Sequence, residues 1–222
     1  MILNEVWPFL TDAIQEADRQ CQSLINGIEC GLLNVKRQLA ASALQATGKK
    51  LTEETLLAWL MRDRLAARGL AVEWEKPYPE TKRRRCDLVV QLTDTTLWLE
   101  IKLAWKAWHE CIKGPVHRNR NFEPYLYGWN KSHSFRHDFE KLEGSRIPPE
   151  HDRAICLIGF DTFQKTMDDA VRKVAATFPA WQLASASHWP DRRDNDFRIA
   201  VWHWWLPSCS HARRPSIVEP HR

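Results

Sequence analysis

The sequence predicts an α/β fold in which a mixed central sheet is flanked by helices, because helical and β-rich segments alternate along the chain. Apolar residues at helical spacing, together with capping residues, predict helices over 52–68, 134–144 and 161–178. Runs rich in apolar, β-branched and aromatic residues predict strands over 71–78, 86–92, 96–103, 154–160, 181–187 and 197–206. Residues 154–160 are continuously apolar, which is typical of a strand buried on both faces.

The chain divides into three parts by pattern. Residues 1–48 are predicted to form an N-terminal helical arm, with helices over 4–26 and from about 32 to 46. Residues 49–206 contain all the predicted strands and form the main domain. Residues 207–222 combine Pro, Arg and His without periodicity and are predicted to be a disordered basic tail.

Two helices of the main domain have clear ends. The first begins at Thr52, a good N-cap, and stops at Gly69. The second begins at Ser134 and stops at Gly144, with apolar residues on one stripe. Asp138 and Lys141, on this second helix, are predicted to be surface charges.

A β-hairpin is predicted at the centre of the main domain. Strands over 86–92 and 96–103 flank a polar Thr-Asp-Thr turn. Asp87 lies at the start of the first strand, and Glu100 and Lys102 lie near the end of the second, on one face. If the strands pair across the turn, two carboxylates and one ammonium group meet at one end of a largely buried sheet.

Charges inside a sheet are costly unless they are paired or bind a metal. One interpretation is a structural ion pair between Lys102 and either Glu100 or Asp87. The other is a metal site, because two carboxylates facing one gap suit a hard cation such as Mg²⁺, with water and a substrate phosphate completing its coordination. A neighbouring lysine can then orient the attacking water or offset charge on the phosphate.

Asp87 followed by Glu100-Ile101-Lys102, after a helix and a strand, resembles the PD-(D/E)XK nuclease superfamily. The resemblance spans about residues 50–165 and departs from the motif at Cys86, where the motif has proline. It implies a three-layer restriction-endonuclease-like core and a Mg²⁺-dependent endodeoxyribonuclease, with Mn²⁺ as a substitute metal. It further implies that Asp87 and Glu100 bind the metal, that the Ile101 carbonyl is a further ligand, and that Lys102 is the catalytic lysine.

The helix before the first strand often carries another metal-facing glutamate in this superfamily. Glu54 is the preferred candidate here, because it lies about four whole turns before Gly69, on the helix face expected to meet the sheet. Glu53 is displaced from that face by roughly 100° around the helix. The alternative is that both glutamates only complement the positive end of the helix.

Basic residues near these carboxylates form the candidate nucleic-acid-binding set. A basic run directly before Asp87 is either a solvated turn or a phosphate contact. The long segment after Lys102 interleaves basic and aromatic residues, and is either a substrate-binding loop or an aromatic-anchored structural insertion. The candidates are Lys82, Arg83, Arg84, Arg85, Lys106, Lys113, Arg118 and Arg120.

Composition narrows the class of protein. A formal net charge of +4 over 222 residues permits nucleic-acid binding. The six cysteines include no C-x-x-C pair, and neither a signal peptide nor a membrane-length apolar run is present. A soluble, cytoplasmic protein with reduced cysteines and no membrane association is expected, and the resemblance implies DNA rather than RNA as partner. A homodimer or a larger complex remains open, as do a non-cleaving nucleic-acid-binding or assembly protein and a plain interaction protein.

Overall fold

A computed structural model describes residues 3–23, 53–105, 107–108, 117–118, 134–161, 164–190 and 198–209, together with Met1, Gln45 and Gly48. The helices are α1 (Leu3–Ser23), α3 (Glu53–Ala67), α5 (Phe135–Glu143) and α6 (Gln164–Ala175). The strands are β1 (Val72–Tyr78), β2 (Thr81–Gln91), β3 (Thr96–Trp105), β4 (Ala107–Trp108), β5 (His117–Arg118), β6 (Asp152–Asp161), β7 (Gln182–Pro190) and β8 (Arg198–Leu206).

Six of the strands form one mixed sheet in the order β1-β2-β3-β6-β8-β7. The first three strands form an antiparallel meander, and β6 then pairs with β3 in parallel. The remaining pairs, β6 with β8 and β8 with β7, are antiparallel. The predicted α/β class with a mixed sheet is therefore confirmed. The short strands β4 and β5 pair separately from this sheet.

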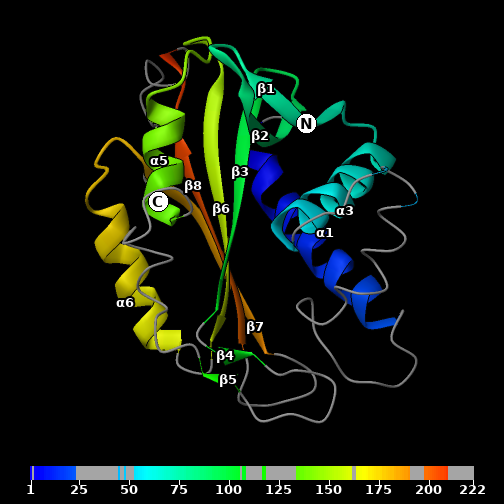
Figure 1. Ribbon diagram of the computed structural model, residues 1–222, viewed down its shortest axis with the longest axis vertical. Helices are drawn as coiled ribbons and strands as arrows, with labels where there is room; N and C mark the ends of the chain where they lie inside the picture. The colour runs from blue at the N-terminus through cyan, green and yellow to red at the C-terminus, as the bar shows by residue number, and fades with distance from the viewer. Residues whose placement is uncertain are drawn as a thin grey trace, which may run out of the picture.

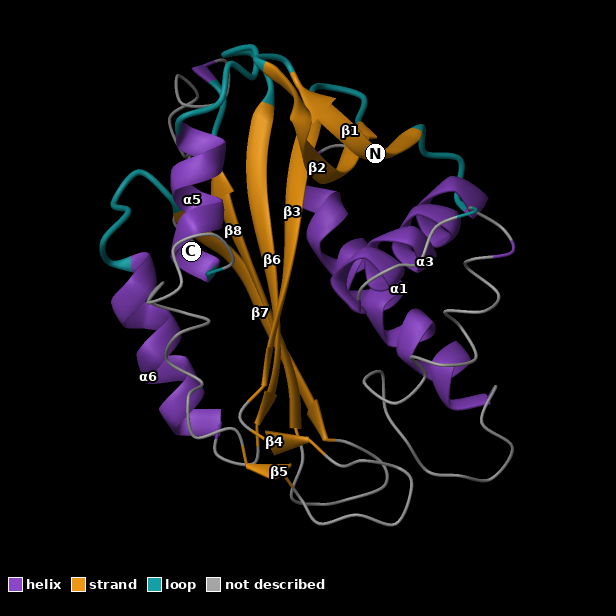
Figure 2. Ribbon diagram, in the orientation of Figure 1, coloured by secondary structure: helices purple, strands orange, loops and turns teal. Residues whose placement is uncertain are grey.

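Helices cover both faces of the sheet (Figure 1). Helices α1 and α3 pack on one face, and α5 and α6 lie on the other, so the secondary-structure view shows helix, sheet and helix in three layers (Figure 2). The α1/α3 side of the core is mostly aliphatic, with Leu10, Met61, Leu99 and Ile101 among its buried residues. The α5/α6 side is rich in aromatic rings, including Phe135, Phe139, Trp98, Trp202 and Trp204.

The central hairpin forms as predicted. Gln91 pairs with Thr96 across the polar turn, and the antiparallel register continues to Leu88 opposite Leu99. The predicted helix over 134–144 is also confirmed: the Ser134 hydroxyl accepts a hydrogen bond from the His137 N–H, and Gly144 closes the last turn. Both features are coded locally, by turn and capping residues, which explains why sequence patterns identify them.

The basic run before Asp87 is not a turn. Lys82, Arg83, Arg84 and Arg85 form the exposed first half of β2, paired with β1. The charged side chains are tolerated in a strand because this part of the hairpin projects past the β2–β3 ladder and stays in water. The turn lies earlier, at Pro79 and Glu80.

The N-terminal helix belongs to the same hydrophobic core as the sheet. Val6, Leu10 and Ile14 are fully buried with α3 residues such as Met61. The helix predicted from about 32 to 46 lies almost entirely outside the described residues, and so does 210–222 of the predicted tail. At the start of that tail, the Ser208 N–H donates to Asp152 and the Cys209 N–H donates to the Pro149 carbonyl.

None of the described helices is long and apolar enough to cross a membrane. Cys86 and Cys156 are buried free thiols, and Cys209 is an exposed one.

Candidate active site

Asp87 lies where the β2–β3 ladder opens. Regular pairing between the two strands stops at Leu88 opposite Leu99, and the next N–H of β3 on that side, from Ile101, donates to Asp87 Oδ2 at 2.8 Å. The carboxylate thus takes the place that a β2 carbonyl would hold in a longer ladder. The N–H and C=O of one strand residue point toward the same neighbouring strand, so the Ile101 carbonyl faces this gap too.

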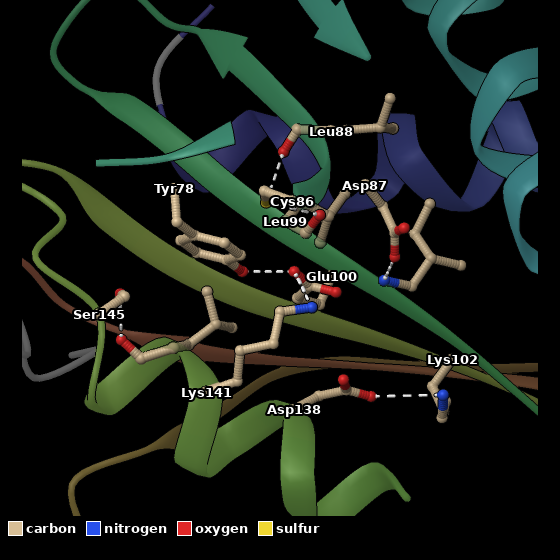
Figure 3. A network of polar contacts seen from close by, with 12 residues as sticks. Tyr78, Cys86, Asp87, Leu88, Leu99, Glu100, Lys102, Asp138, Lys141 and Ser145 are labelled. Carbon is tan, nitrogen blue, oxygen red and sulfur yellow. Dashed lines mark hydrogen bonds and ion pairs between the residues drawn. The ribbon is translucent and has the colours of Figure 1, made fainter. Parts of the chain in front are cut away.

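Glu100, one residue earlier on β3, is buried on the α5 face of the sheet. Its Oε1 accepts a hydrogen bond from the Tyr78 hydroxyl at the end of β1 and pairs with Lys141 Nζ of α5 at 2.7 Å (Figure 3). The Lys141 ammonium also lies 5.3 Å from the centre of the Tyr78 ring. Side chains from β1 and α5 therefore converge on one carboxylate oxygen of β3.

Lys102 and Asp138 form a second contact between β3 and α5. Lys102 Nζ lies 3.7 Å from Asp138 Oδ2, and both side chains are more than nine-tenths buried. The Asp138 Oδ2 atom has no hydrogen-bond donor among the described residues. This pair is therefore an electrostatic contact at a distance too long for a hydrogen bond.

These two contacts give β3 and α5 a matched set of charges. Glu100 and Lys102, two apart on a strand, face Lys141 and Asp138, three apart on a helix, each acid opposite a lysine. The prediction that Asp138 and Lys141 are surface charges is wrong. Asp138 lies on the apolar stripe of α5. Lys141 lies one position before the last apolar residue of that stripe and turns toward the sheet because Glu100 is there.

The stripe itself was a signal for Asp138. Buried residues of α5 recur as Phe135, Asp138, Phe139 and Leu142, which is the spacing of a single helix face. An acid inside that series is expected to face the core. No comparable signal marks Tyr78, since its contact with Glu100 joins residues that are far apart in the chain.

Burial has the largest effect on the pKa values of both carboxylates. Burial, then the neighbouring Glu100 charge, raises the pKa of Asp87, and the Ile101 N–H opposes this effect. Burial also raises the pKa of Glu100, against the opposing effect of Lys141. Asp87 keeps partial access to solvent whereas Glu100 has almost none. The charge cluster is therefore largely shielded from solvent, and Asp87 is its more accessible carboxylate.

Cys86 occupies the position before Asp87. It is fully buried, and its Sγ lies 3.3 Å from the carbonyl oxygens of both Leu88 and Leu99. Burial raises the pKa of the thiol, so it stays neutral. The cysteine thus fills the point where the two strands separate and adds no charge to the site.

The donor set suits a hard divalent cation. Within the described part of the chain, hydrogen bonds and ion pairs use Oδ2 of Asp87 and Oε1 of Glu100, and leave the second oxygen of each carboxylate without such a contact. Two carboxylate oxygens and the Ile101 carbonyl are the ligand types that Mg²⁺ prefers. Among the described residues, no group of three His, Cys, Asp or Glu side chains is arranged to hold a metal. Any such ion would complete its coordination with the carbonyl and water.

The other predicted site residues lie elsewhere or outside the described part. Glu54 belongs to α3, on the sheet face opposite α5, and its side chain is outside the described residues. Lys106, Lys113 and Arg120 are also outside them. Arg118 is in β5, where only its backbone is described.

Comparisons of the chain with protein-family models, with curated proteins and with solved structures find no match.

Proposed function

We propose that this protein is a metal-dependent nuclease that hydrolyses DNA phosphodiester bonds. One observation carries the proposal: where β2 and β3 separate, the Ile101 N–H holds Asp87 close enough to Glu100 for the Glu100 charge to raise the pKa of Asp87. Burial raises the pKa of both carboxylates, and the Glu100 charge raises that of Asp87 further, so an added positive charge would be favourable at this point. A divalent cation is the partner that would relieve this repulsion most effectively.

The topology supports a restriction-endonuclease-like core for the same protein. A helix precedes three antiparallel strands, and a second helix then leads to a strand parallel to the third. This order places the two acids on adjacent strands and brings α5 against them. The resemblance to PD-(D/E)XK nucleases rests on this order of elements together with the three motif residues Asp87, Glu100 and Lys102.

Asp87 and Glu100 would hold Mg²⁺ or Mn²⁺ with the Ile101 carbonyl, and such an ion makes a bound water more acidic and offsets the charge of the scissile phosphate. Lys102 Nζ lies 3.7 Å from the Asp138 carboxylate, which keeps its ammonium group at the site. Lys102 therefore acts as a cation that orients the attacking water and stabilises charge on the phosphate. The Ile101 N–H fixes the rotamer of Asp87, and Tyr78 fixes that of Glu100.

The exposed half of β2 supports a nucleic-acid substrate. Lys82, Arg83, Arg84 and Arg85 are exposed and lead along the strand directly to Asp87. Clustered cations bind phosphates whatever the base sequence, so this strand is suited to holding the DNA backbone beside the site.

The test is cleavage of supercoiled plasmid and of labelled single-stranded DNA with Mg²⁺, Mn²⁺ or EDTA. We expect cutting that depends on the metal and falls by about 100-fold or more in both Asp87→Ala and Lys102→Ala. Asp63→Asn, which removes an exposed carboxylate on α3, is the matched control and should cut like the wild type. Cutting that survives both site mutations would exclude this site as the source of the activity.

A second candidate is a nucleic-acid-binding or assembly protein that keeps the fold without cleaving. One observation favours it: Glu100 and Asp138 already have Lys141 and Lys102 as counter-ions, so part of the cluster is satisfied without a metal. Absence of cutting, combined with absence of Asp87-dependent Mn²⁺ binding in calorimetry, would favour this candidate over the nuclease.

A further inference from the structure

Lys141 is a lysine outside the predicted motif, yet within the described part of the chain it forms an ion pair with the motif carboxylate Glu100. Its Nζ lies 2.7 Å from Glu100 Oε1, with 15% of the lysine side chain and 4% of the glutamate side chain exposed. Lys102, the lysine of the motif, is paired instead with Asp138 (Figure 3). The two lysines therefore hold different places in the cluster.

The Lys141 ammonium is held from two sides. Glu100 accepts from it, and the face of the Tyr78 ring lies 5.3 Å away, a distance at which a cation is attracted to the ring. The Tyr78 hydroxyl donates a hydrogen bond to the same Oε1 atom. A side chain located in this way by α5, β1 and β3 does not sample solvent freely as an exposed surface lysine does.

We propose that Lys141 is a resident counter-ion that competes with divalent metal for the charge of Glu100 and so sets the affinity of the site. This inference rests on the proposed metal site at Asp87 and Glu100. Without metal, the lysine neutralises a carboxylate that burial would otherwise make costly. A divalent cation binding to the same carboxylate meets the repulsion of the ammonium group at close range.

Two consequences with opposite signs follow for a variant that lacks this charge. Lys141→Met removes the ammonium but keeps most of the side-chain volume. The metal-free protein should become less stable, because buried Glu100 loses its counter-ion. The affinity for divalent metal should rise on the order of tenfold, because the repulsion is gone. A lysine with a purely structural role would give only the first effect.

The experiment is titration of Mn²⁺ into the full chain by calorimetry, together with thermal unfolding in EDTA and in saturating Mn²⁺. Lys141→Met and Lys141→Gln are the two neutral variants; glutamine can still donate a hydrogen bond to Glu100, which favours folding if methionine does not. Lys141→Arg keeps the charge and should keep the wild-type affinity. Lys173→Met, at an exposed position of α6, is the control and should change neither measurement.

The outcomes separate this inference from the function on which it rests. Tighter Mn²⁺ binding in both neutral variants, with a larger Mn²⁺-induced rise in their Tm, supports it. If the wild type binds Mn²⁺ and both neutral variants bind it with the same or lower affinity, the counter-ion role is overturned and the metal site is retained. No Mn²⁺ binding in the wild type or in any variant overturns the metal site and the counter-ion role together.

Discussion

Two buried polar sites lie on opposite faces of the same sheet, and they handle burial differently. On the α5 face, Glu100 and Lys102 are charged residues, each opposed by a charge of opposite sign from the helix. On the α1 face, His203 of β8 is fully buried, with Trp7 beside it at a ring distance of 5.7 Å. Its Nδ1 lies 2.7 Å from the Ser185 hydroxyl, and Nε2 has no partner among the described residues.

The difference shows what burial demands of a polar group. A buried histidine with one neutral partner is held without charge, and burial lowers its pKa from 6.5 to about 3. A cluster supplied with opposite charges by a second element can remain ionised. We therefore interpret the His203 site as part of the packing, and the α5 face as the face on which chemistry is feasible.

The largest effect on stability is expected from removing one charge from the α5 face. Asp138→Ala takes away the carboxylate that faces Lys102 in a nine-tenths buried environment. We expect a loss of about 3 kcal/mol in the free energy of unfolding, measured by urea denaturation, because a buried charge loses its counter-charge. The double variant Asp138→Ala/Lys102→Met should recover most of this loss. With Lys102→Met measured alone as well, single losses that simply add in the double variant would mean that the two charges are not coupled.

A smaller effect is expected from titrating the other site. The folded-state pKa of His203 lies below the unfolded value of 6.5, so the unfolded chain binds more protons between pH 6.5 and about 3. Stability from this residue is complete above pH 6.5 and falls as the pH drops toward 3. Between pH 7 and pH 5 the loss should be roughly 2 kcal/mol, at about 1.4 kcal/mol per pH unit below 6.5.

Urea unfolding at several pH values checks this, with the His203→Gln variant as reference. The variant should be less stable than the wild type at pH 7. Because glutamine does not titrate, the unfolding free energy of the variant should fall less steeply between pH 7 and pH 5. Parallel pH profiles for the two proteins would show that His203 is not the group responsible.

The smallest effect is expected where both charges are in water. Arg136 and Glu140 pair at 2.8 Å on the outer face of α5, with 54% and 48% of their side chains exposed. Glu140→Gln should change the unfolding free energy by no more than about 0.5 kcal/mol, because solvent screens such pairs. A loss of unfolding free energy as large as that of Asp138→Ala would show that charges on α5 contribute to stability irrespective of burial.

Sequence patterns identified the parts of this fold that are coded by neighbours in the chain. The β2–β3 hairpin, the ends of α5 and the doubly buried strand β6 each carry a turn, a cap or an apolar run as a local signal. The same patterns placed Asp87 and Glu100 together, because the register of a hairpin follows from its turn.

What the patterns could not supply was the partner of each charge. The structural ion-pair interpretation has Lys102 paired with Glu100 or Asp87, whereas its described ion pair is with Asp138. That choice depends on how α5 docks against β3, which is a matter of tertiary packing. The turn interpretation of Lys82 to Arg85 is likewise wrong, because these residues belong to β2, which pairs with β1. Exposed charges are compatible with a strand of this kind because the hairpin projects into solvent.

The charges on β3 also have a consequence for the folding chain. β3 pairs in parallel with β6, so Glu100 meets Ile155 only after a much later part of the sequence has docked. Until then the local meander ends in an apolar strand with an open edge, which is the kind of template that recruits other chains into aggregates. Two charges pointing out of that strand make intermolecular pairing costly, and α5 neutralises them only once the native sheet has been completed. Glu100 and Lys102 would thus also protect their own chain from misassembly.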